Sequence, residues 1–164
     1  MRCLYLIFLL LPVCLAAQQE CKLKKSTDPY TKEARLSTGL ISMKGAGLSI
    51  EADSKEIDFF FTMDGSEKCF NDASTAVVMY EGTKVKGTFR NSGSVNCDGF
   101  FHIIFKNLAG SNSLMQRLIT QKIISIQFTG SNKSQILLTL SPEEQQKIMT
   151  LGDCLVKEAK TLIK

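Results

Sequence analysis

The sequence contains no tryptophan, one histidine and three prolines among 164 residues. Because His102 is the only imidazole, catalytic or zinc sites that need two or more histidines are excluded. The net charge of +4 is small and spread along the chain, which excludes the concentrated basic surface of a nucleic-acid-binding protein. The hydrophobic share of 44% is enough for a core, so we expect one folded domain and no nucleic-acid partner.

The motifs of several enzyme classes are also missing. The chain has no C-x-x-C pair, no G-x-S-x-G nucleophile, no H-E-x-x-H and no glycine-rich phosphate loop. Acidic side chains do gather near one predicted strand, at Asp53, Glu56, Asp58 and Asp64. A hydrolase acting through such carboxylates is the third of our functional hypotheses. We predict no enzymatic activity, no cofactor and no bound metal.

The first residues have the pattern of a secretory signal peptide. Arg2 provides a positive charge, and residues 4–11 form an apolar run that Pro12 ends. Cleavage after Ala17 removes residues 1–17 and leaves 18–164 as a single β-rich domain. The apolar run is shorter than the roughly 20 residues that span a bilayer. We therefore expect export to the periplasm or the cell exterior, without stable membrane insertion.

The cysteines predict a covalent framework. Two of the six cysteines leave with residues 1–17, and Cys21, Cys69, Cys97 and Cys154 remain. An even number of cysteines in an exported chain is typical of disulfides, although spacing alone leaves the pairing open. We favour Cys69–Cys97, because both lie in loops between predicted strands. We favour Cys21–Cys154 because this bond would join the start of the mature chain to its last helix.

Short apolar or alternating segments, separated by turn residues, predict a mainly β protein with about eight antiparallel strands. These strands are expected over residues 35–42, 48–52, 56–63, 76–80, 84–90, 100–105, 123–128 and 135–140. The fourth and fifth strands, 76–80 and 84–90, are spaced as a hairpin, and so are the last two. The pattern does not distinguish a sandwich from a partly closed barrel.

Two helices complete the predicted fold, a short one over residues 111–118 and a C-terminal one over residues 142–162. Ser141, Pro142 and Glu144 place a capping serine, a first-turn proline and a third-position glutamate in the order of a capping box. Apolar residues then recur every three or four positions, so one side of the C-terminal helix should pack on the sheets.

Two predicted strands carry consecutive aromatic residues, and alternation gives each of them a ring on both faces. The C-terminal helix is the simplest cover for the second face of such strands. If a barrel encloses a ligand cavity instead, its lining would come from one set of alternating positions. That set contains Phe60, Phe100, His102 and Ile104.

The chain resembles the small exported proteins of unknown function that are common in Bacteroidetes-type bacteria. The resemblance is carried by Cys21 and the following Asp28-Pro29-Tyr30-Thr31, by Lys68-Cys69-Phe70 and by Asn96-Cys97-Asp98-Gly99. It implies a β-rich fold closed by a late cysteine, and no assigned chemistry. At the level of fold, the chain is also similar to lipocalins, which combine eight strands with a late helix, although the Gly-x-Trp start is absent.

The leading hypothesis is therefore an exported, non-enzymatic binding domain whose partner is a protein, a glycan or a small apolar ligand. The second hypothesis is a lipocalin-like carrier of a small apolar molecule. The two hypotheses differ in where the ligand binds, because a carrier needs a cavity lined by rings.

A first prediction concerns the disulfides. The mature protein, purified without reductant, should weigh about four hydrogens less than the fully reduced chain. Reduction should lower the melting temperature, since each bond contributes about 3–5 kcal/mol in the chain-entropy account. Mass spectrometry and thermal melting check both points. Equal melting temperatures of the oxidised and reduced protein would contradict the framework.

Overall fold

The computed structural model describes residues 21–65 and 68–163, so the predicted signal peptide (1–17) lies outside the described residues. Within this part of the chain, none of the helices is long and apolar enough to span a membrane. The strands are β1 (Lys24–Thr27), β2 (Ala34–Met43), β3 (Ala46–Ala52), β4 (Glu56–Met63), β5 (Thr75–Tyr80), β6 (Lys86–Arg90), β7 (Phe100–Lys106), β8 (Ile123–Thr129) and β9 (Gln135–Thr139). The helices are α1 (Ser113–Thr120) and α2 (Pro142–Ala159), and a short 3-10 turn (Lys160–Leu162) follows α2.

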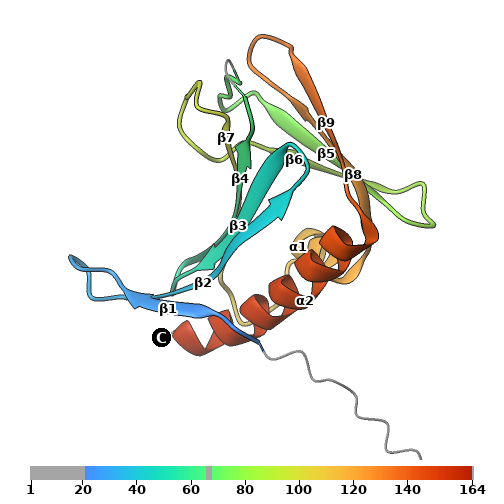
Figure 1. The fold of residues 1–164 in the computed structure, drawn as a ribbon. Helices are drawn as coiled ribbons and strands as arrows, with labels where there is room; N and C mark the ends of the chain where they lie inside the picture. Colours follow the sequence, from blue (N-terminus) through green and yellow to red (C-terminus); the bar gives the residue numbers. More distant parts are fainter. Residues whose placement is uncertain (1–20, 66–67, 164) are drawn as a thin grey trace, which may run out of the picture.

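The strands form two antiparallel sheets in a sandwich-like arrangement rather than a closed barrel (Figure 1). The larger sheet has the order β1-β2-β3-β4-β7, and the smaller has the order β6-β5-β8-β9. All eight predicted strands and both hairpins are present, which confirms the mostly β prediction. The additional strand β1 was not predicted, because its residues, Lys-Lys-Ser-Thr, are all polar and exposed.

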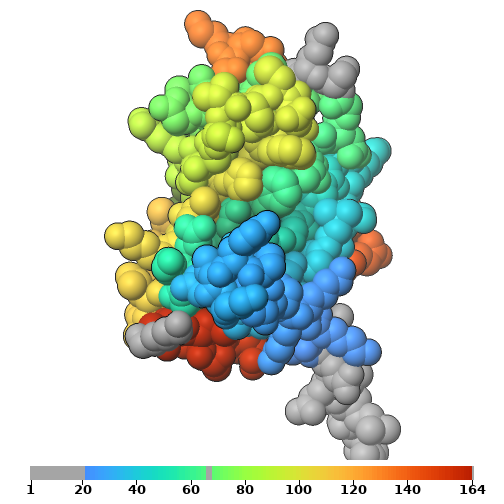
Figure 2. Space-filling model, turned by 90° about the vertical axis from the view of Figure 1, so that its left-hand side faces the viewer, coloured from blue at the N-terminus to red at the C-terminus, as the bar shows by residue number. Residues whose placement is uncertain are grey.

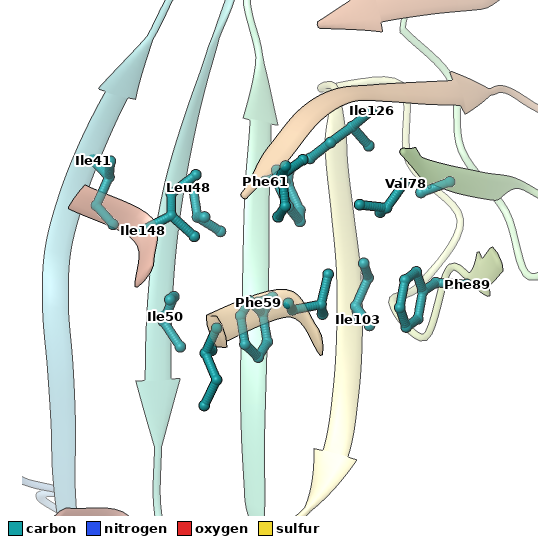
Figure 3. Packing of buried hydrophobic residues seen from close by; sticks show 14 of the residues in the cluster. Ile41, Leu48, Ile50, Phe59, Phe61, Val78, Phe89, Ile103, Ile126 and Ile148 are labelled. Carbon is teal, nitrogen blue, oxygen red and sulfur yellow. The ribbon is translucent and has the colours of Figure 1, made fainter. Parts of the chain in front are cut away.

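The core lies between the inner faces of the two sheets. On β4, Phe59 and Phe61 point inward (Figure 3). Phe101 of β7 is fully buried as well. Phe128 of β8 meets both Phe61 and Phe101 edge to face, with ring centroids 5.3 and 5.0 Å apart. Such T-shaped ring contacts add to the stabilisation from burial itself. The space between the sheets is therefore filled by side chains.

The predicted capping box begins α2. Ser141 Oγ accepts a hydrogen bond from the Glu144 N–H, and the Glu144 carboxylate accepts one from the Ser141 N–H. Glu144 also accepts a hydrogen bond from the backbone N–H of Lys44, in the β2–β3 turn. Partial burial raises the pKa of Glu144, but these hydrogen bonds outweigh it and hold the pKa below the ordinary value of 4.5. The cap thus joins the helix start to the sheet.

Helix α2 covers the inner face of the larger sheet on its β2–β3 side, beside α1 (Figure 1). A Cβ atom on Gly152 would lie 2.7 Å from Ile119 of α1, so only glycine allows this close approach of the two helices. The expectation that this helix covers the second aromatic face is wrong. Phe60 and Phe100 lie on the outer face of the sheet, away from α2.

Two disulfides join Cys21 to Cys154 and Cys69 to Cys97, which confirms the favoured pairing. The first bond ties the chain ahead of β1 to α2. The second ties the loop between β4 and β5 to the loop between β6 and β7. Cys154 lies on α2 one position before the buried Leu155. Two disulfides in one chain fit an oxidising environment.

A second prediction concerns Tyr80, which is 2% exposed and whose hydroxyl has no hydrogen-bond partner among the described residues. Burial raises the pKa of Tyr80 to about 12 from its ordinary value of 10.0. The unfolded chain therefore loses this proton first, and the free energy of unfolding should fall as the pH rises from 10 towards 12. Tyr80→Phe should weaken that fall, and at neutral pH it should change stability by less than about 1 kcal/mol.

Urea unfolding at pH 7, 10 and 11 checks this expectation. The matched control is Tyr30→Phe, because Tyr30 is 92% exposed and should leave the alkaline loss unchanged. An equally steep alkaline loss in Tyr80→Phe and in the wild type would show that burial of this phenol is not the cause.

Candidate functional site

The residues expected to line a cavity do lie together, but on the outer face of the larger sheet rather than inside a barrel. Register pairs Phe60 with His102, and Asp58 with Ile104, across β4 and β7. Phe100 is 38% exposed, whereas Phe60, His102 and Ile104 are half-buried. We call Phe60, Phe100, His102 and Ile104 the aromatic face. Figure 2 views the molecule from the side of this sheet.

The centre of the aromatic face is a hydrogen-bonded pair of His102 and Asp58. Nδ1 of His102 lies 2.7 Å from Oδ2 of Asp58, and both side chains are about one-quarter exposed, at 26% and 21%. Because an ionised carboxylate can only accept, Nδ1 is the donor. The Phe60 ring stacks on the imidazole with centroids 4.5 Å apart. Hydrogen bond and stacking together fix the ring orientation.

The loop between β6 and β7 covers the other side of the imidazole. A Cβ atom on Gly93 would lie 2.5 Å from Cδ2 of His102, so the Gly93 backbone packs directly against the ring. Asn91 is buried, and its side chain exchanges hydrogen bonds with the Gly93 backbone. A larger residue than glycine would displace either the loop or the imidazole.

The same loop closes half of the free edge of β7. The side chain of Asn96 accepts a hydrogen bond from the Phe100 N–H and donates one to the Phe100 C=O. At His102, Asn91 Oδ1 accepts from the backbone N–H, and the Ser92 N–H donates to the C=O. Unpaired edge strands attract other strands. Here, two asparagine side chains and the Ser92 N–H satisfy the polar groups of Phe100 and His102 that β4 leaves unpaired.

The other half of this edge is open. In an antiparallel pair, alternate residues direct both backbone polar groups away from the partner strand. Phe100 and His102 direct theirs towards the loop, so Ile104 and Lys106 direct theirs to the same side. No described residue forms a hydrogen bond with these groups of Ile104 or Lys106. Strand β6 pairs with β5 in the smaller sheet and does not continue along β7.

A groove of about 680 Å³ lies beside this open edge. We call it the β7 groove, and it is lined by Ser54, Lys55, Glu56, Ser92, Ile104, Lys106, Asn107 and Leu108. Leu108 is 60% exposed and Ile104 half-buried, so the groove combines apolar side chains with two lysines and one glutamate. Ile104 belongs to both the groove and the aromatic face.

The acidic residues of the hydrolase hypothesis divide between two places. Asp53, Glu56 and Asp58 line a pocket of about 130 Å³ together with Glu51 and Arg35. Asp64 lies apart, at the end of β4, where its N–H donates to the Gly45 C=O. Asp53 has a structural task, because its Oδ1 accepts the N–H groups of Lys55 and Glu56 in the β3–β4 turn.

The one cation of this pocket, Arg35, also has an acidic partner. Its guanidinium lies 3.2 Å from the Asp28 carboxylate. Backbone N–H donors of Thr31 and Tyr30, together with the Arg35 charge, hold the pKa of Asp28 below its usual value.

An aspartate-linked histidine is able to act as a general base, with Nε2 taking the proton. Such a mechanism needs a nucleophile within hydrogen-bond reach of Nε2. Among the described residues, no hydroxyl forms a hydrogen bond with that nitrogen, and Cys21, Cys69, Cys97 and Cys154 are all in disulfides. The described part of the chain also holds no cluster of three or more metal-binding side chains.

The Asp58–His102 pair was not predicted, although both residues were singled out separately. They are 44 positions apart, and nothing local in the sequence links them. The one sequence feature that could have indicated this pair is the presence of two aromatic segments, because pairing Phe59–Phe61 with residues 101–103 brings Asp58 close to His102.

Comparisons of the chain with protein-family models, curated proteins and solved structures found no match.

A third prediction concerns the closed half of the β7 edge. The backbone N–H groups of Phe100 and His102 should exchange with solvent more slowly than that of Ile104. Asn96→Ala should speed exchange at Phe100 by about tenfold or more, because it removes the acceptor, and should leave His102 protected by Asn91. Residue-resolved hydrogen exchange by NMR checks this.

The matched control is Asn132→Ala, in the β8–β9 hairpin, where Asn132 also accepts a backbone N–H. That variant should not alter exchange at Phe100. Fast exchange at Phe100 in the wild-type protein would contradict the closed edge.

Proposed function

We propose that this chain is an exported binding domain, braced by two disulfides, that holds a partner on its aromatic face and in the adjoining β7 groove. One observation carries the proposal. Partly exposed apolar side chains meet on a sheet face, beside a groove, and the Asp58–His102 pair holds one of their rings in place. Exposed apolar groups on a pre-formed surface are typical of binding sites.

The covalent framework and the sequence both support the proposed compartment. Disulfides persist where the environment is oxidising, which agrees with export. The signal peptide over residues 1–17 stays a prediction, and so does the resemblance to small exported bacterial proteins. Neither is needed for the binding face itself, which is built from β4, β7 and the loop between β6 and β7.

Binding is favoured over catalysis by the surroundings of His102. The imidazole is held between Phe60 and the Gly93 backbone, and its hydrogen bond to Asp58 keeps one ring orientation. This arrangement orders the loop against the edge of β7. His102 thus has a structural role in the binding surface, and this role needs no nucleophile.

The carrier hypothesis takes a different form in this fold. Buried rings such as Phe61, Phe101 and Phe128 fill the space between the sheets. A small apolar ligand would therefore bind on the outer surface rather than between the sheets. The β7 groove, with Ile104 and Leu108, is the apolar opening next to the aromatic face.

The fourth prediction tests the binding face with probes of three chemical classes. The oxidised, ¹⁵N-labelled protein is titrated separately with N-acetyl-phenylalanine amide, methyl glucoside and dodecanoate. At least one probe should shift amide signals of Phe60, Phe100, His102 or Ile104, because the partly exposed apolar groups there gain from burial. Phe100→Ser should weaken that response several-fold.

The matched control is Leu137→Ser, because Leu137 is 64% exposed on the smaller sheet. This variant should respond as the wild type does. The proposal is contradicted if no probe shifts the aromatic face, or if both variants lose the response equally. A response to dodecanoate alone would select the carrier form of the proposal.

A further inference from the structure

The open end of β7 presents main-chain groups in a pattern that only another main chain matches well. Ile104 and Lys106 each direct one N–H donor and one C=O acceptor to the same side of the strand. A sugar or a fatty acid does not supply donors and acceptors at this spacing. An extended peptide does, and pairing with a sheet edge is a recognised mode of peptide binding.

The side chains around this edge favour a particular peptide composition. On the outer face, a residue paired with Ile104 would lie beside an apolar side chain, within reach of Leu108. A residue paired with Lys106 would lie beside an exposed ammonium group. The lysines at 55 and 106 outnumber the single glutamate of the groove. Complementarity therefore calls for an apolar residue and an acidic residue two positions apart.

The groove is also held in shape before any partner binds. The Asn107 side chain donates hydrogen bonds to the C=O groups of Asp53 and Ala159, both at 2.8 Å, and its N–H donates to the Lys55 C=O. These bonds tie the end of β7 to the β3–β4 turn and to the end of α2. A pre-formed site reduces the ordering cost of binding.

The loop between β6 and β7 limits how far along β7 a partner strand can pair. Ser92 donates to the His102 C=O, so an added strand cannot continue past Ile104 towards Phe100. The site therefore accepts only a short paired segment.

From these observations we infer that the β7 groove binds an extended segment of a partner protein as a short added strand. The segment carries an acidic and an apolar residue separated by one residue. This inference rests on the proposed function, and it names the partner of that site as a peptide chain. The acidic residue pairs with Lys106 and the apolar residue with Ile104.

The experiment uses the full oxidised protein and two synthetic peptides, acetyl-Thr-Asp-Ala-Val-Thr-amide for the antiparallel orientation and acetyl-Thr-Val-Ala-Asp-Thr-amide for the parallel one. NMR titration at millimolar peptide should shift the amide signals of Ile104, Lys106 and Leu108. Hydrogen exchange at Ile104 and Lys106 should slow on binding. In the antiparallel peptide the valine N–H faces the Ile104 C=O, so N-methylation of the valine should weaken binding about tenfold or more. In the parallel peptide the alanine N–H takes that place, and the alanine is methylated instead.

Two variants of the protein separate the main-chain and charge contributions. Ile104→Pro removes an N–H that points away from β4, where proline is tolerated in an edge strand, and should abolish the shifts at Lys106 and Leu108. Lys106→Glu should weaken the aspartate peptides several-fold, without removing any backbone group. The matched control is Lys86→Glu, an exposed lysine on edge strand β6, which should bind as the wild type does.

Each remaining outcome overturns the inference. Equal binding of a peptide and its N-methylated form would exclude strand pairing. Failure of both peptides to shift Ile104 and Lys106 would do the same, while a response of the aromatic face to N-acetyl-phenylalanine amide would leave the proposed function intact. Protection of Ile104 and Lys106 that grows with protein concentration, without peptide, would show that the occupant is a second copy of the chain.

Discussion

The pairing of β4 with β7 is the contact on which both the core and the candidate site depend. The chain leaves the larger sheet after β4, builds the β5–β6 hairpin of the smaller sheet, and returns to place β7 beside β4. In this register, one face of the pair carries the rings that meet Phe128, and the other carries Asp58 and His102. A slip of one residue would move His102 into the core and a phenylalanine to the surface.

Because β7 is the last strand of the larger sheet, its outer backbone N–H and C=O groups have no neighbouring strand. The loop between β6 and β7 pairs with only some of these groups. At Phe100, the side-chain amide of Asn96 supplies a donor and an acceptor, as a neighbouring strand does. At His102, Asn91 Oδ1 is the acceptor and the Ser92 N–H is the donor. The Cys69–Cys97 bond joins the same loop to the segment after β4. The loop therefore covers the edge of β7 only as far as His102, where the Ser92 N–H bonds the C=O. From Ile104 onward the edge is open beside the β7 groove.

The elements predicted well are those whose signal is local. The Ser141-Pro142-Glu144 start of α2 was recognised because all its partners lie within three residues. Alternation likewise predicts which residues of β7 share a face, since it needs no knowledge of the partner strand, and the structure buries one of the two sets. Strand β1 was not predicted because its four polar residues are exposed and show no apolar alternation. Only backbone pairing with β2 defines this strand. Helix α1 begins after Asn112, inside the predicted range 111–118, and the Asn112 side chain accepts the N–H groups of Leu114 and Met115.

The candidate site could not be predicted in the same way, because its contacts join residues that are distant in the chain. The wrong expectation that the C-terminal helix covers the second aromatic face shows the difference. The apolar side of α2, read from the sequence, indicates that the helix packs against another element but not which one. The order of the strands in the sheet determines that α2 packs on the inner face of β2 and β3. Phe60 and Phe100 are then left on the outer face, and a hydrogen-bonded histidine, a glycine backbone and a groove surround them. Apolar residues with no role in the core need a different explanation from those inside it, and a bound partner is the one that the neighbouring open edge supports.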